Sequence, residues 1–426
     1  MNSIVAQERI IALRKKRSAQ DLRFKYYGFI AMCLALAVLV FLLYSIFSRG
    51  FTAFQKTTIL LEINYDQEVL KLTPDSTEQE IEKGKFFKVK KNALNNVFEN
   101  LSKSDAKLIK KLFSTNIDNE IKNYFLNNPS VLNTKQKLWV TAHSNVDQML
   151  KGNSSRDVPE DRRKLNDIQL SFIDQLVQEN RIQKEFNNFF FTRADSRHPE
   201  IAGIAGSFMG SLLTLFVVFI LSFPIAIGAS VYLEEFAPKN KLTELIEVNI
   251  SNLAAVPSIV FGLLGLGVLL NVFGFPRSTP LVGGTVLALM TLPTIIIACR
   301  ASLKAVPPSI KEGALAIGAT KSQAVFHHVV PLALPGTLTG TIIGLAQALG
   351  ETAPLIMIGM VAFIPNIPTG ITEPSASLPV QIFLWVESAE RGFQEKSAAA
   401  IMIILLFLFM MNALAVYLRN RFEKKW

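Results

Sequence analysis

A single carboxylate stands inside a long apolar stretch of this chain. Glu351 lies in the run Thr337–Phe363, followed by Thr352 and Pro354. An ionised acid at the centre of a membrane helix costs about 2.5–3.5 kcal/mol, so its side chain should face protein or water and have a partner. Pro354 removes a backbone hydrogen bond, which predicts a kink just beyond it.

Two interpretations of Glu351 remain open: an acid that locks two helices together, or a gate or pathway residue. A carboxylate repels anions, so a direct contact with an anionic substrate is disfavoured. Within the apolar runs there is no Lys or Arg, and only Arg300 lies at the end of one. We therefore expect any cationic partner of Glu351 on another subunit.

Small residues recur along the same predicted helix. Gly336, Gly340 and Gly344 are four residues apart, and Gln347 and Glu351 follow on roughly the same face. A small-xxx-small stripe favours close packing of membrane helices. We expect this stripe to form a helix interface with a partner membrane subunit, which replacing Gly340 with leucine should weaken.

A short polar hairpin precedes that helix. Ser309 and Glu312 fit a capping box, Gly318 suits a helix stop, and Thr320 with Gln323 fits a second box. The pattern predicts two short helices, the second ending before Pro331, with Gly313, Ala314 and Ala316 forming a small-residue face on the first. Close approach by a partner is one interpretation of this face; an ordinary amphipathic turn, with Glu312 as a cap and nothing more, is the other.

Composition indicates a membrane protein that also has a sizeable soluble part. Of 426 residues, half are hydrophobic and only 18% are charged, which is low for a soluble protein. The formal charge of +10 is concentrated beside apolar runs at both ends of the chain, which argues against nucleic-acid binding and predicts that both termini are cytoplasmic.

The elements that must position these residues are six predicted spans and one inserted domain. The spans are 27–47, Ser207–Tyr232, Leu253–Val272, Leu281–Cys299, Thr337–Phe363 and Ser397–Tyr417. The segment between the first two is polar, with a predicted strand at Thr57–Ile63 and predicted helices at Asn92–Leu101, Asp105–Phe113 and Leu165–Phe186. Its lone histidines, and the apolar settings of Cys33 and Cys299, predict no metal site or disulfide.

Several blocks in the second half resemble the permeases of phosphate ABC importers. Glu312-Gly313-Ala314 with Gly318 resembles their coupling loop, although Gly313 stands where alanine is usual. Gly350-Glu351-Thr352-Ala353-Pro354-Leu355 resembles their signature, with supporting blocks at 232–237, 252–262 and 292–296. Many members have arginine in place of Gln347, so their intramembrane charge pairs do not carry over to that position.

The resemblance implies an all-α membrane fold of the type I ABC importer kind, in the bacterial inner membrane. The implied divisions are a cytoplasmic N-terminus (1–26), a first span (27–47), an external mixed α/β domain (48–202), a permease region (203–420) with a coupling loop (300–335), and a cytoplasmic C-terminus (421–426).

The partners that the resemblance implies are a homologous permease, two ATPase subunits and an external phosphate-binding protein. The chain has no phosphate-binding Gly-x-x-x-x-Gly-Lys-Ser/Thr loop, so we expect it to be no enzyme and to bind no cofactor, with ATP hydrolysed by the ATPase partner. Two alternative functions remain open: a permease for another oxyanion such as phosphonate, molybdate or sulfate, and a membrane-anchored sensor.

Overall fold

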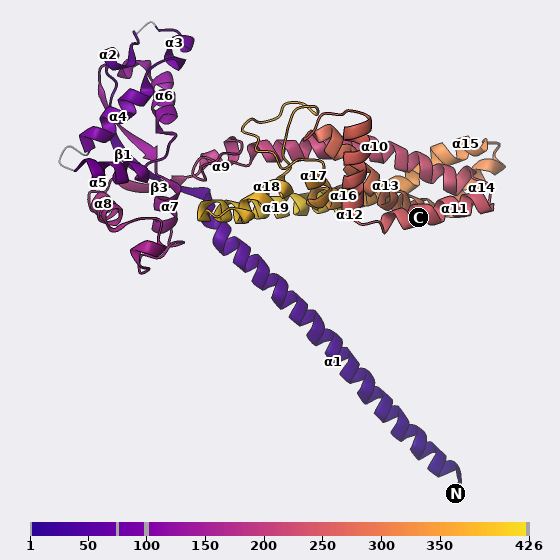
Figure 1. Ribbon diagram of the computed structural model, residues 1–426. Coiled ribbons are helices and arrows are strands. Elements are labelled where there is room, and N and C mark those ends of the chain that lie inside the picture. Colours follow the sequence, from indigo (N-terminus) through magenta and orange to yellow (C-terminus); the bar gives the residue numbers. More distant parts are fainter. Residues whose placement is uncertain (1, 74–75, 98–101, 423–426) are drawn as a thin grey trace.

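The computed structural model describes residues 2–73, 76–97 and 102–422. It contains a long first helix, a small α/β domain and an elongated helical bundle (Figure 1). The small domain lies at one end of the bundle, and helices α14 (Pro308–Ala316) and α15 (Lys321–Ala324) lie at the other. The expected fold class, mostly helical with a mixed α/β domain inserted after the first span, is confirmed.

The small domain is built on a three-stranded antiparallel sheet in the order β2-β1-β3. The strands are β1 (Gln55–Asn64), β2 (Lys135–Thr141) and β3 (Ile182–Phe186). On β1 the side chains of Ile59, Leu61 and Ile63 alternate onto one fully buried face. Helices cover the sheet: α2 (Gln67–Leu70), α3 (Glu78–Glu82), α4 (Phe86–Val97), α5 (Lys103–Ile109), α6 (Ile117–Asn127), α7 (Ser144–Leu150), α8 (Asp167–Gln178) and α9 (Asn188–Thr192).

The predicted strand at Thr57–Ile63 is confirmed, whereas the predicted helix Leu165–Phe186 was too long. Helix α8 stops at Gln178 because Asn180 adopts a left-handed conformation, with φ of 53°. The amide of Arg181 then donates to the carbonyl of Leu176 at 2.9 Å, which closes the helix end. The chain reverses there and enters β3. The last four residues of the predicted helix Asn92–Leu101 lie outside the described residues.

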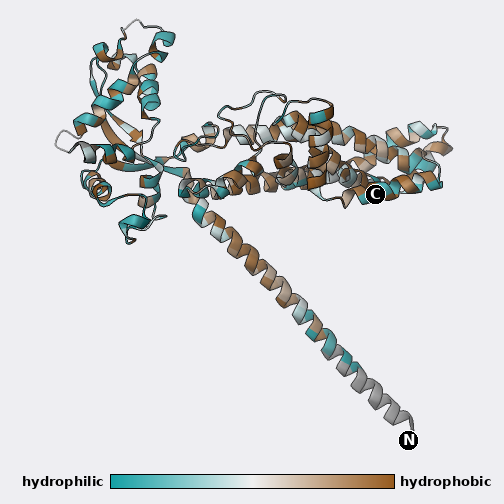
Figure 2. Cartoon of the chain, in the orientation of Figure 1, coloured by the Kyte–Doolittle hydropathy of each residue, from teal (hydrophilic) through white to brown (hydrophobic). Residues whose placement is uncertain are grey.

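Within the described residues, five helices are long and apolar enough to span a membrane, or up to six if a bent pair counts as one span. The bundle comprises α10 (Ala205–Val231), α11 (Lys241–Ala254), α12 (Ser258–Leu264), α13 (Pro280–Lys304), α14 (Pro308–Ala316), α15 (Lys321–Ala324), α16 (Val330–Gly350), α17 (Ala353–Met357), α18 (Leu378–Glu387) and α19 (Arg391–Phe422). Hydrophobic residues dominate it, whereas hydrophilic ones are frequent on the small domain (Figure 2).

Two predicted spans need correction. Leu253–Val272 is not one straight helix, because α11 and α12 meet at a bend of 102° just before Ser258. Pro257 lacks a backbone N–H and caps α12 from outside, so the helix restarts there in a new direction. The span predicted at Thr337–Phe363 starts earlier, at Lys321, and ends at Gly350.

The first helix, α1 (Asn2–Gly50), is continuous and contains the predicted span 27–47. Its apolar window is unburied within the chain, and it leaves the bundle at an angle (Figure 1). It meets α19 at its end, where Gly50 lies against the backbone of Ala398 and Ala399. Of the basic residues at the opposite terminus, Lys424 and Lys425 lie outside the described residues.

Candidate coupling surface and domain junction

The polar hairpin forms a short helix at the end of the bundle, but its predicted first cap was wrong. Helix α14 begins at Pro308, directly after Pro307, and no side chain caps it. Proline suits the first turn because its missing N–H would be unpaired there anyway. Ser309 is therefore inside the helix, and Glu312 is exposed and makes no hydrogen bond to any described residue.

The predicted stop at Gly318 and the predicted second capping box are confirmed. Gly318 has φ of +96°, which suits glycine, and the amide of Ala319 donates to the carbonyl of Ala314. Thr320 and Gln323 then cap each other's backbone amides at the start of α15. Local hydrogen bonds thus set the turn between the two helices.

The predicted end of the second helix before Pro331 was wrong. A π-helical segment, Val325–Val329, joins α15 directly to α16, so residues Lys321–Gly350 form one helix of 30 residues. Pro331 lies in the first turn of α16 and has no backbone N–H to donate. The wider π turn before it accommodates this missing hydrogen bond. The hairpin is therefore continuous with the helix that leads to Glu351.

Two glutamates hold the base of this hairpin to the bundle. They lie in the π-helical end of α10, Tyr232–Phe236. Glu234 is within 3.4 Å of Arg300 and 3.6 Å of Lys304 on α13, and Glu235 pairs with Lys311 on α14. Partial burial makes such a connected network stiffer than an isolated surface pair.

The exposed face of the hairpin is apolar. Ile317 is 85% exposed and Leu315 is 42% exposed, and nothing lies within 4 Å of the position that a Cβ on Gly313 would occupy. Ala314 instead packs inward. The hairpin therefore presents an apolar tip on a helix that is fixed by an ion pair.

The stripe of small residues on α16 packs against another helix of the same chain. A Cβ on Gly336 would meet Ser302, one on Gly340 would lie 2.3 Å from the Cβ of Ala298, and one on Gly344 would touch Ile295. All three contacts belong to α13. The expected role of this stripe as the contact with a partner subunit was therefore wrong.

Replacing Gly340 with leucine should destabilise the fold. It should not specifically weaken association with a partner subunit. The added side chain would push α16 away from α13, and overpacking of this kind costs about 1–3 kcal/mol or more. Thermal unfolding of the purified chain would measure this. Gly350→Ala is the matched control, since nothing lies within 4 Å of its added carbon; equal melting temperatures for the two variants would contradict the assignment.

Glu351 lies at a break in the membrane helix and not in its middle. Helix α16 ends at Gly350, Glu351 is extended, and α17 starts at Ala353 with Pro354 in its first turn. The kink predicted from Pro354 is thus a complete interruption. Glu351 and Thr352 are partly exposed and Gln347 is exposed, so Gln347 does not share the buried face of the glycines. Among the described residues Glu351 has no ion pair.

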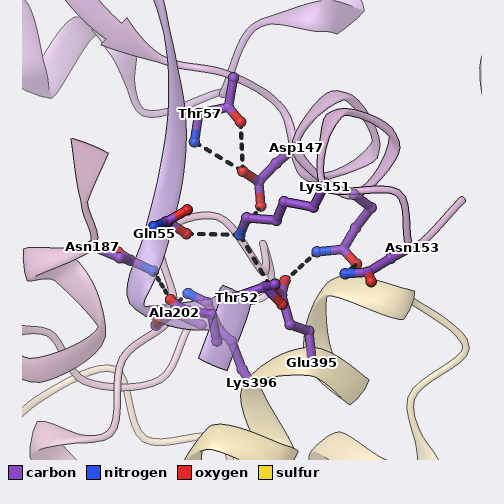
Figure 3. A network of polar contacts seen from close by, with 12 residues as sticks. Thr52, Gln55, Thr57, Asp147, Lys151, Asn153, Asn187, Ala202, Glu395 and Lys396 are labelled. Atoms are coloured by element: carbon purple, nitrogen blue, oxygen red, sulfur yellow. Dashed lines mark hydrogen bonds and ion pairs between the residues drawn. The ribbon is translucent and has the colours of Figure 1, made fainter. Parts of the chain in front are cut away.

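A second charged cluster, which sequence reasoning missed, joins the small domain to α19 (Figure 3). Its centre is the Nζ atom of Lys151, which lies 2.6 Å from Asp147 and 3.1 Å from Glu395 and donates to the carbonyl of Gln55 at 2.7 Å. Asp147 also accepts from the amide and hydroxyl of Thr57 at 2.9 and 2.8 Å. The side chains of Lys151 and Glu395 are only 2% and 5% exposed.

Lys396 extends this junction. Its ammonium donates to the carbonyl of Ala202, just before α10. Nearby, the indole of Trp385 on α18 donates to Asp195 at 3.1 Å, and burial raises the pKa of Asp195. The adjacent Glu395 and Lys396 stand at the start of an apolar run, where a sequence pattern cannot separate flanking charges from buried ones.

Comparisons with known proteins follow this division of the chain. Residues 223–424 match a family profile described as the inner membrane component of binding-protein-dependent transport systems. The chain is 31% identical over 223 residues to the phosphate transport system permease protein PstA of Yersinia pestis, covering 52% of this chain and 73% of that protein. The chain belongs to the permease family of binding-protein-dependent ABC transporters.

Two further relatives are named as transporter permeases. Identity is 33% to the phosphate permease protein PstC of Haemophilus influenzae, covering 47% of this chain and 69% of that protein. It is 28% to the probable ABC transporter permease YqgI of Bacillus subtilis, covering 55% and 84%. A solved methionine ABC transporter, MetNI, gives 14% identity and a TM-score of 0.39, covering 52% of this chain and 95% of that one. Residues 12–160 match a domain of unknown function, DUF3333.

Membership of this permease family bears on several predictions made from the sequence. This permease is a multi-pass membrane protein and a transporter subunit of an ABC importer, not an enzyme. In such transporters, ATP is hydrolysed by partner ATPase subunits, and a binding protein completes the complex.

Proposed function

We propose that this permease is the PstA-type subunit of a phosphate importer and forms half of its translocation pathway. The observation that carries the proposal is the Gly350–Leu355 block, which stands at an interruption of the membrane helix that continues the exposed hairpin. Relatives named as phosphate permeases, at 30–33% identity, support it.

The proposed complex contains a homologous permease similar to PstC, two ATPase subunits similar to PstB and a phosphate-binding protein similar to PstS. The hairpin Pro308–Ser322 would dock on an ATPase, with Glu312, Gly313, Ala314 and Gly318 shaping its contact surface. In this arrangement both termini and the hairpin lie in the cytoplasm, and the domain at 48–202 lies outside.

Force from the ATPase would reach the pathway along Lys321–Gly350. Because this helix is unbroken, a displacement of the hairpin moves its far end, where Glu351 and Thr352 lie beside the pathway. Glu351 has no charged partner among the described residues, so we propose that its partner is a cation on the other permease. This would neutralise the acid where a phosphate anion must pass.

Uptake assays decide the substrate. The permease, its sister permease, the ATPase and the binding protein would be reconstituted in liposomes, and uptake of radiolabelled phosphate measured with and without ATP. ATP-dependent phosphate uptake that a tenfold excess of sulfate, molybdate or phosphonate does not reduce is the expected result. Uptake of one of those anions in preference to phosphate would favour the alternative substrate class.

A further inference from the structure

A small basic hollow lies at the junction between the small domain and α19. Its volume is about 100 Å³. Arg156, Arg163 and Lys164 line it from the small domain, Arg391 lines it from the first turn of α19, and Glu390 is its single carboxylate. Four cations and one carboxylate thus surround the space.

The arginines around the hollow retain hydrogen-bonding capacity. Arg163 pairs with Asp167, yet its Nε atom is buried and has no hydrogen-bond partner among the described residues. Arg156 pairs with Asp174 at 2.7 Å, and Arg391 donates to a backbone carbonyl at 2.6 Å. A guanidinium has five N–H donors, so each can still bind an anion.

A wider approach leads to the same residues. A second hollow, of about 630 Å³, shares Arg163 and Lys164 with the first and adds Lys110, Lys111 and one carboxylate, Glu160. Its four cations outnumber that carboxylate, and a cleft in which one sign of charge predominates raises the local concentration of oppositely charged solutes. The arrangement draws anions towards the smaller hollow.

We propose that the smaller hollow is a binding site for a small tetrahedral oxyanion, with inorganic phosphate as the representative ligand. Arginine forks match the oxygen geometry of phosphate, and the hollow is large enough for an anion of a few heavy atoms. The site lies at the junction of the small domain and α19, away from Glu351. It therefore does not depend on which substrate the transporter carries.

Hydrogen bonds connect the residues around the hollow to α19. Gln148 lines it and donates to Glu395, the Asn153 side chain donates to Gln148 at 3.0 Å, and Arg391 donates to the carbonyl of Asn153. An anion held between Arg163 and Arg391 would bridge the small domain and the start of α19. Occupancy of the site would thereby stiffen the junction.

Equilibrium dialysis of the purified full-length permease against radiolabelled phosphate, at constant low ionic strength in chloride, tests the site. We expect saturable binding near one phosphate per chain, and about tenfold weaker binding in Arg163→Gln, because the variant loses a charge-assisted hydrogen bond to the anion. Arg162→Gln is the matched control: Arg162 is adjacent and exposed, lines neither hollow and should change affinity less than about twofold. Absence of saturable binding, or equal losses in both variants, would overturn the proposal.

A second variant guards against misfolding of Arg163→Gln, since Arg163 is largely buried. Arg391 is exposed, so Arg391→Gln should fold normally and still bind phosphate several-fold more weakly; unchanged affinity would refute the site. If these variants weaken capture of the binding protein while the wild type binds no free phosphate, the cations serve an acidic protein surface and the proposal fails. Because no ATPase is present, the outcome is independent of the uptake assays.

Discussion

Replacing Ile317 with aspartate should abolish ATP-driven transport while the permease remains folded in the membrane. Ile317 is 85% exposed at the tip of the hairpin, so the chain itself loses no packing. A partner surface that covers this apolar side chain would instead have to bury a carboxylate without a partner, which costs several kcal/mol. Co-purification of the ATPase and substrate-stimulated ATP hydrolysis are the measurements.

Ile317→Val is the control, because it keeps an apolar contact and should retain most of the coupling. Glu312→Gln distinguishes a docking role of Glu312 from a helix-capping role. The carboxylate caps no helix in the structure, so a loss of coupling in this variant would report on docking and not on hairpin folding. Full transport by Ile317→Asp would show that the hairpin tip is not the docking surface.

Replacing Lys151 with methionine should loosen the small domain from the bundle. The change leaves the buried carboxylates of Asp147 and Glu395 without their shared cation, and breaking a buried pair from one side costs about 3–5 kcal/mol. Thermal unfolding and limited proteolysis of the junction around Asp195–Ile204 in the full-length chain would detect the loss. Adding Glu395→Gln should restore part of the stability, because only Asp147 then stays unpaired.

Lys135→Met provides the same substitution at an exposed ion pair. Lys135 is 69% exposed and 3.6 Å from Glu62, so the variant should be nearly as stable as the wild type. Equal destabilisation by the two lysine variants would mean that the cluster around Lys151 does not fix the domain to α19.

Apolar run length located most of the membrane helices, because any spanning segment needs about twenty uncharged residues. It could not locate their ends. Pro331 looks like a stop in sequence, yet a π turn carries the helix through it. Gly350 and Glu351 look like helix interior, yet the helix ends at Gly350 and Glu351 is extended. Both outcomes depend on tertiary packing that overrides local propensity.

Local signals performed well where the hydrogen bonds are local. Gly318 and Thr320 set their turn through partners a few residues away, so the sequence pattern was sufficient. Lys151 and Glu395 are 244 residues apart in the chain, and nothing in either neighbourhood indicates the other. The glycine stripe shows the intermediate case: its close packing could be predicted, but not whether the neighbouring helix is in the same chain.

The 30-residue helix from Lys321 to Gly350 has a mechanical consequence as a lever with unequal arms. One of its two closest approaches to α13, at Gly340 against Ala298, lies about 28 Å from the hairpin end and about 15 Å from the other at 1.5 Å per residue. A rod that tilts about that fulcrum halves the stroke that it receives. A broad movement at the hairpin would thus arrive at Glu351 as a smaller and more forceful one.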